Sequence, residues 1–156
     1  MIYENVLVPY DKSDHAKHAL ETALKLVSDD KKAVVHVLYV VEAPEMHDAA
    51  FSVAARMAGV QSIDVSSEQQ MKRAYCDRHK QDVLQNIEPL IAGCPNEVCV
   101  EVATGRPHHA ILDYANERGC DLIVMGCRGL NALQGMIGSV SYAVLRSSSV
   151  PVFIVK

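Results

Sequence analysis

Short runs of apolar residues recur along the chain and predict five β-strands. Most of these runs are nearly continuous, as in Val6-Leu7-Val8, which is typical of strands that are buried on both faces. β-Branched residues dominate the second run and favour a strand there. The expected strands cover residues 2–9, 33–41, 97–103, 122–125 and 150–155.

Between the expected strands, apolar residues recur at the spacing of amphipathic helices. Ser13 is suited to cap the first helix, and Pro107 fits the first position of the third. Pro89 is expected to kink the last turn of the second helix. Residues 42–65 are less regular and indicate at most a short helix at 49–58. The expected helices cover residues 13–27, 66–93, 107–119 and 139–147.

Strands and helices alternate strictly along the sequence, and this order predicts an α/β fold. Because each connection is long enough to hold a helix, the strands are expected to be parallel, with right-handed crossovers and helices on both faces. The expected architecture is a single open five-stranded parallel sheet. No linker or internal repeat divides the 156 residues, so one domain over residues 1–156 is expected.

Composition and charge narrow the function classes. Residues of the apolar class make up 49% of the chain, enough for a core, but aromatic residues make up only 5%. With few stacking platforms and a net charge of −4, the chain is not expected to bind nucleic acid. No apolar run approaches the roughly 20 residues of a membrane span, and no signal-peptide pattern opens the chain. Five cysteines, an odd number, suit free thiols and a cytoplasmic location.

The loops that follow the strands are the expected site, because ligands of open parallel sheets bind beyond the carboxyl ends of the strands. The loop after Met125 is the richest of these. It holds four glycines between positions 126 and 138, and a helix begins near Ser139. Glycines allow a ligand to approach the backbone closely, and a helix start favours an anion. A phosphate group is the expected ligand of this loop.

The glycine loop is neither of two common phosphate motifs, because the chain has no G-x-x-x-x-G-K-[ST] and no G-x-G-x-x-G after the first strand. Other features, spread over the whole chain, resemble the universal stress protein family. They are Pro9-x-Asp11-x-Ser13, Gly126-x2-Gly129, Gly138-Ser139 and the terminal Val150-Pro151-Val152. The resemblance implies a Rossmann-like fold and a nucleotide-binding module of stress response or regulation.

The resemblance also implies a cofactor, ATP with Mg²⁺, and the residues that hold it. Asp11 would contact the ribose or adenine end, and Val40 would meet adenine through its backbone. The ribose and phosphates would be surrounded by Gly126, Arg128, Gly129, Gly138, Ser139 and Val140. Pro9 and Met125, at strand ends, complete the expected site. The family motif is usually G-x2-G-x9-G-[S/T], and this chain is one residue shorter, which leaves the register of residues 133–137 open.

An enzyme is the alternative interpretation, as a slow ATPase or a phosphoryl or nucleotidyl transferase that uses the same site. No catalytic residue is assigned, because the sequence offers no Walker lysine, no evident water-positioning Gln or Glu, and no acidic cluster for a catalytic metal. A phospho-acceptor receiver domain fits poorly, because Ala103-Thr104-Gly105 stands where its Asp would be. A flavodoxin fits poorly as well, because the loop after the first strand is not rich in Ser and Thr.

Histidine and cysteine side chains leave further alternatives open. His15 with His18, and His108 with His109, are candidate metal ligands, but neither pair has the spacing of a strong motif, and no metal site is expected. Cys127 is a candidate for redox control because it lies beside a helix start, although a small loop residue is the default interpretation.

The last expected strand also predicts a partner. Residues 150–155 are apolar, with a charge only at Lys156, and this strand is expected at an edge of the sheet. An apolar edge tends to pair with another strand, and a two-fold axis lets it pair with its own copy. A homodimer through the C-terminal strand is therefore expected, with an unidentified protein as a further candidate partner and no membrane partner.

Overall fold

The computed structural model describes residues 3–41, 57, 65–129 and 136–156. Its regular elements alternate as the sequence predicts, and the short helix expected at 49–58 lies outside the described residues except for Met57. The strands are β1 (Asn5–Pro9), β2 (Val34–Val41), β3 (Glu97–Thr104), β4 (Leu122–Gly126) and β5 (Val152–Val155). The helices are α1 (Asp14–Val27), α3 (Val65–Ile91), α4 (Pro107–Glu117) and α5 (Ser139–Ser147).

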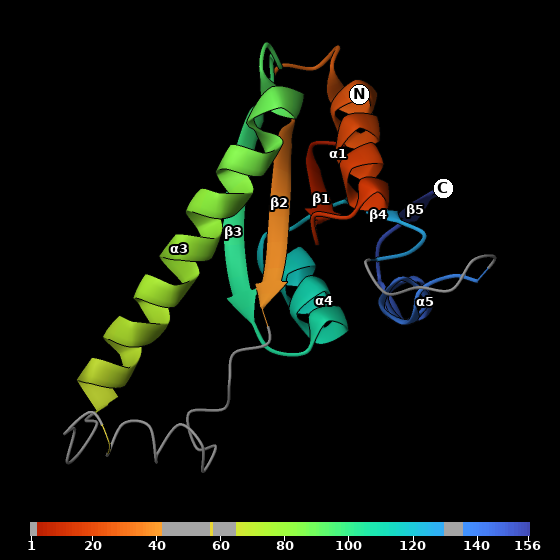
Figure 1. Cartoon of the computed structure of the whole chain (residues 1–156). Helices are drawn as coiled ribbons and strands as arrows, with labels where there is room; N and C mark the ends of the chain where they lie inside the picture. The colour runs from red at the N-terminus through yellow and green to blue at the C-terminus, as the bar shows by residue number, and fades with distance from the viewer. Residues whose placement is uncertain (1–2, 42–56, 58–64, 130–135) are drawn as a thin grey trace.

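The five strands form one parallel sheet in the order β3-β2-β1-β4-β5, which confirms the predicted fold class (Figure 1). β1 lies in the middle, paired with β2 on one side and β4 on the other. The order of the strands reverses at β1, and a ligand cavity is expected beyond the carboxyl end of such a position. β5 lies at an edge of this sheet, as expected.

Helices cover both faces of the sheet (Figure 1). Successive residues of a strand point to opposite faces, so Val6 and Val8 of β1 pack with α1 and α3, whereas Leu7 packs with α4 and α5. The nearly continuous apolar runs arise because both sides of the central strands are buried. In Figure 1 the N-terminal end of α3 extends beyond the arrowheads of β2 and β3.

The ends of the helices follow the expected local signals, but the first and last strands begin later than predicted, and β1 begins at Asn5 rather than at residue 2. The Ser13 side chain caps α1 by accepting a hydrogen bond from the Ala16 N–H at 3.2 Å, and Pro107 occupies the first turn of α4. β5 begins at Val152, two residues later than predicted. Pro151 has no N–H to donate, although its carbonyl accepts from the Ile123 N–H at 3.0 Å.

His36 is a buried polar residue of β2. Its Nδ1 lies 3.2 Å from the Tyr114 hydroxyl of α4, and its Nε2 has no hydrogen-bond partner within the described parts of the chain. Burial lowers the pKa of His36, and the positive charge of Arg118 lowers it further. The folded protein therefore favours the neutral imidazole.

Stability should consequently fall in mildly acidic solution. Above the ordinary histidine pKa of about 6.5, His36 is neutral in both states, whereas at lower pH the unfolded chain gains its proton first. The free energy of unfolding then falls by at most about 1.4 kcal/mol per pH unit, until the folded protein also gains the proton. Urea unfolding at pH 7 and pH 5 checks this: His36→Leu should lose less stability than the wild type, and equal losses would contradict it.

Candidate functional site

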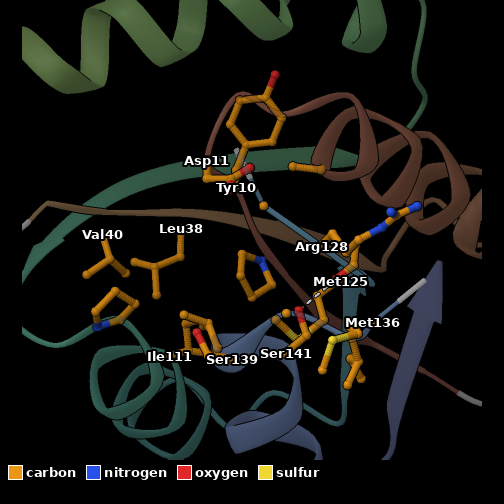
Figure 2. A pocket seen from close by; sticks show the side chains of 18 residues that line it. Tyr10, Asp11, Leu38, Val40, Ile111, Met125, Arg128, Met136, Ser139 and Ser141 are labelled. Carbon is orange, nitrogen blue, oxygen red and sulfur yellow. Dashed lines mark hydrogen bonds between the residues drawn. The ribbon is translucent and has the colours of Figure 1, made fainter. Parts of the chain in front are cut away.

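A cavity of about 470 Å³ opens where the strand order reverses, beyond the carboxyl ends of β1, β2 and β4 (Figure 2). The first two turns of α4 and the first turn of α5 complete its wall. A volume of this size is ordinary for a site that holds a small molecule. The fold therefore places a ligand-sized cavity at the position that is expected for this class of sheet.

The structure brings all of the sequence-predicted site residues together around this cavity. They come from four separate parts of the chain, because the carboxyl ends of parallel strands meet at one edge of the sheet. The predicted residues in the wall are Pro9, Asp11, Val40, Met125, Gly126, Arg128, Gly129, Gly138, Ser139 and Val140. Their contacts with a nucleotide stay a prediction.

Eight further wall residues were not predicted from the sequence. They are Tyr10, Ala16, Leu38, Pro107, Ile111, Met136, Ile137 and Ser141. For two of these positions the sequence did hold a signal. Leu38 lies two residues before Val40 on the same face of β2, and Ile111 lies one helical turn after Pro107. Strand and helix periodicity would have found both.

One end of the cavity is an apolar wall. Leu38 and Val40 of β2 lie opposite Ile111 of α4, and all three point into the same space (Figure 2). Leu38 and Ile111 are almost completely buried, so their positions are fixed by the core beneath them. Such a wall suits a flat, largely apolar group.

The other end is the glycine loop, which is held in place from both sides. The Gly138 N–H donates to the Cys127 carbonyl at 2.7 Å, and the Cys127 N–H donates to the Val155 carbonyl of β5 at 2.7 Å. The buried Ser141 hydroxyl donates to the Gly126 carbonyl at 2.8 Å. The loop from 126 to 128 is thus fixed between the end of β5 and the start of α5.

The start of α5 favours an anion at this end. Gly138 is the N-cap residue, and it has no side chain to cap the first-turn N–H groups of the helix. The positive end of the helix dipole therefore meets the cavity without a competing cap. Residues 130–135 of the loop, and with them much of the shortened spacing, lie outside the described residues.

Asp11 and Arg128 are the charged residues in the described wall of the cavity. The Asp11 carboxylate accepts a hydrogen bond from the Ser13 N–H at 3.0 Å and lies against Gly129, where a β-carbon would be only 2.4 Å from its Oδ2. Arg128 extends away from the end that Leu38 and Val40 form (Figure 2). The carboxylate and the guanidinium are thus placed near the glycine loop, apart from the apolar wall.

The histidine candidates lie among packing contacts in the described parts of the chain. In the described ranges, no group of three His, Cys, Asp or Glu side chains could hold a metal ion. The His108 and His109 rings pack against each other at 4.1 Å between centroids, and the His15 backbone packs against Gly126. All five cysteines are free, as expected. Within the described chain, no helix is long and apolar enough to cross a membrane.

The reversed strand order and the cavity above it define a doubly wound α/β protein with a ligand site at its switch point. Comparison with known proteins gives the family. The model of the universal stress protein family matches residues 2–156, and the chain belongs to this family. The resemblance seen in the glycine loop and the strand ends is thereby confirmed.

Curated relatives span nearly the whole chain. Universal stress protein MJ0577 of Methanocaldococcus jannaschii is 28% identical over 158 residues, which cover 100% of this chain and 96% of the relative. The universal stress protein in the QAH/OAS sulfhydrylase 3′ region of Thermus aquaticus is 30% identical, over 99% of this chain and 100% of the relative.

Solved structures agree with the fold. The structure of MJ0577 has a TM-score of 0.74 at 24% identity, over 100% of this chain and 97% of that one. A universal stress protein in complex with cAMP has a TM-score of 0.62 at 21% identity, over 99% and 98%. The Archaeoglobus fulgidus universal stress protein in complex with dAMP has a TM-score of 0.59 at 22% identity, over 100% of both chains.

Proposed function

We propose that this universal stress protein is a nucleotide-binding regulatory module that binds ATP, with Mg²⁺, in the cavity beyond β1, β2 and β4. The observation that carries the proposal is the division of this cavity into an apolar wall and a glycine loop beside the uncapped start of α5. A purine base and a phosphate chain need these two environments at opposite ends of one site.

Each part of ATP has a matching part of the cavity in this proposal. The adenine lies against Leu38, Val40 and Ile111, which form the apolar wall. The phosphates lie at the glycine loop, where N–H groups and the helix dipole favour negative charge. The ribose lies between them, near Asp11, whose carboxylate accepts hydrogen bonds from hydroxyl groups. The cAMP and dAMP complexes of two structural neighbours support an adenine nucleotide.

The charged groups of the cavity also fit a bound Mg²⁺. Magnesium is typically held by one or two carboxylates together with substrate phosphates and water. Asp11 is the carboxylate of the described wall, and it lies against the glycine loop at Gly129. When bound, the ion would offset the charge of the triphosphate and would be held by the phosphates and water, and Asp11, whose carboxylate is placed at the ribose, would face the water shell of the ion.

The proposed module binds ATP without rapid hydrolysis. Fast phosphoryl transfer needs a positioned nucleophile and concentrated positive charge at the γ-phosphate. The described wall supplies backbone N–H groups, a helix dipole and Arg128, which stabilise the ground state about as well as the transition state. Occupancy of the site would then bias the conformation of the protein or its choice of partner. The partner and the cytoplasmic location stay predictions.

Two measurements on purified protein test this function. Acid extraction should release an adenine nucleotide, or calorimetry should detect binding of added ATP with Mg²⁺. Phosphate release should be far slower than the roughly 1 to 100 per second of working kinases. Turnover in that range that is lost in Asp11→Asn or Ser139→Ala would show that the protein is an enzyme and not only a binding module. Absence of adenine-nucleotide binding in the folded protein would contradict both.

We further propose a homodimer that forms through β5. This strand lies at the sheet edge, and Phe153 on it is 47% exposed. Tyr142 and Leu145 of the neighbouring α5 are 53% and 48% exposed. An unpaired apolar edge with further exposed apolar side chains beside it favours pairing with a second copy across a two-fold axis.

Light scattering at micromolar concentration should therefore give the mass of a dimer. Phe153→Glu should shift the protein to the mass of a monomer, because it places two like charges near the symmetry axis. Leu26→Glu is the matched control, since Leu26 is 42% exposed but lies on α1 rather than on the edge strand, and it should remain dimeric. A monomeric wild type would contradict the proposed interface.

A further inference from the structure

Three consecutive residues in the turn between β1 and α1 make contacts on two different sides of that turn. Asp11 lines the cavity, whereas the side chains of Tyr10 and Lys12 make their polar contacts with α3. In Figure 2 the Tyr10 ring points away from Leu38 and Val40, toward α3. The residue that we place at the ribose is therefore flanked on both sides by residues that are attached to a helix outside the cavity wall.

These two attachments are specific contacts. The Tyr10 hydroxyl donates a hydrogen bond to the Asn86 side-chain oxygen at 2.5 Å, and Tyr10 is almost completely buried. The Lys12 ammonium pairs with the Asp82 carboxylate and lies 5.2 Å from the centre of the Tyr39 ring. Asp82 and Asn86 are four residues apart, so they lie on one face of α3 and hold the turn at two neighbouring points.

The backbone of this turn is held in an unusual conformation. Within the described residues, Lys12 is the one non-glycine residue with a positive φ, at 67°. A side chain disfavours this left-handed conformation, and such strain persists where the surrounding contacts impose it. The ion pair with Asp82 holds the Lys12 side chain against α3, one residue after Asp11. The hydrogen bond from Lys12 also lowers the pKa of Asp82.

We propose that these two attachments aim the Asp11 carboxylate at the ribose hydroxyls of the bound nucleotide, so that α3 sets a preference for ribonucleotides over deoxyribonucleotides. Tyr10, Lys12, Asp82 and Asn86 are positioning residues, because they act on the nucleotide through Asp11. The inference rests on the proposed function. It adds that residues of α3, which lie outside the cavity wall, control how one sugar hydroxyl is recognised.

Calorimetric titration with ATP and with 2′-deoxy-ATP, both with Mg²⁺, tests this inference. The wild type should bind ATP about tenfold more tightly, as expected for a hydrogen bond to a charged group. Lys12→Gly removes the ammonium while glycine accepts the positive φ, and Asp82→Asn removes the opposite charge. Each variant should reduce the preference for ATP to about twofold to threefold, chiefly by weakening the binding of ATP.

Two further variants separate positioning from a general loss of structure. Glu101→Gln removes another contact of α3, the Lys80–Glu101 pair at 3.8 Å, and should leave the preference unchanged. Asp11→Asn should abolish the preference, and adding Asp82→Asn to it should have no further effect, because both act through one carboxylate.

The outcomes distinguish this inference from the proposed function. A wild type that binds neither nucleotide would contradict the proposed function itself. A second outcome would overturn the role of α3 alone. In it, the wild type prefers ATP, Asp11→Asn abolishes the preference, and Lys12→Gly and Asp82→Asn both retain it. Equal weakening of both nucleotides by the α3 variants would also overturn it, since that is the effect of a merely structural contact.

Discussion

Gly129→Val should reduce ATP affinity by about 100-fold or more in a protein that still folds. A β-carbon at this position would lie 2.4 Å from the Asp11 Oδ2, so the carboxylate would have to leave the position that we assign to ribose recognition, and the valine methyl groups would also occupy the part of the cavity where we place the phosphates. Gly129 itself is exposed and belongs to neither core cluster, so little stability depends on it. Calorimetry measures the affinity, and circular dichroism confirms that the variant is folded.

Gly138→Ala is the graded control for this prediction. Its β-carbon would meet the nearest atom, the Arg128 Cα, at 3.4 Å, which is an ordinary contact. We expect a folded protein with less than about a tenfold loss of ATP affinity. If Gly129→Val bound ATP as tightly as the wild type, then neither Asp11 nor this part of the loop would contact the nucleotide.

Gly126→Ala should instead prevent stable folding, although it lies only three residues earlier. Here a β-carbon would lie 2.7, 2.8 and 3.0 Å from the Cβ, carbonyl carbon and carbonyl oxygen of His15. Backbone atoms in the first turn of α1 cannot turn aside as a side chain can, so the helix would have to move off β4. We expect the free energy of unfolding to fall by about 3 kcal/mol or more.

Urea denaturation followed by circular dichroism measures this loss, with Gly138→Ala as the control that should unfold near the wild-type midpoint. A Gly126→Ala variant as stable as the wild type would show that α1 has room above β4. Gly126 and Gly129 therefore have different structural roles. Gly126 permits packing of a helix on a strand, and Gly129 leaves space beside Asp11.

Local patterns were sufficient to predict the sheet and the place of the cavity. The period of apolar residues gave the strands, and the end of a parallel strand is by geometry near the ends of its neighbours. Contacts between distant residues could not be predicted in this way. Tyr10 and Asn86 are 76 positions apart, and neither carries a local signal for the other. The packing of Gly126 against α1 could not be predicted for the same reason, because its close neighbour is His15.

The buried Asn96 is another feature that sequence patterns do not indicate. Its side-chain N–H₂ group lies within 2.6 to 3.3 Å of the carbonyl oxygens of Val27, Asp30 and Ala33, at the end of α1 and in its connection to β2. An asparagine before a strand usually reads as a turn residue. Its partners lie 63 to 69 positions earlier, so only the folded chain reveals that it joins two connections at the far edge of the sheet from the cavity.

The central place of β1 has a consequence for the order in which the protein can form during synthesis. β1 can pair with β2 once both have left the ribosome, but its other edge has no partner until β4 follows, more than 100 residues later. Such long-range pairing is slow and leaves an unpaired strand edge exposed. The cavity has parts on both sides of β1, from Pro9 to Ser141. A nascent chain that ends before β4 has three of the five strands and no complete nucleotide site, so ligand can stabilise only a nearly finished molecule.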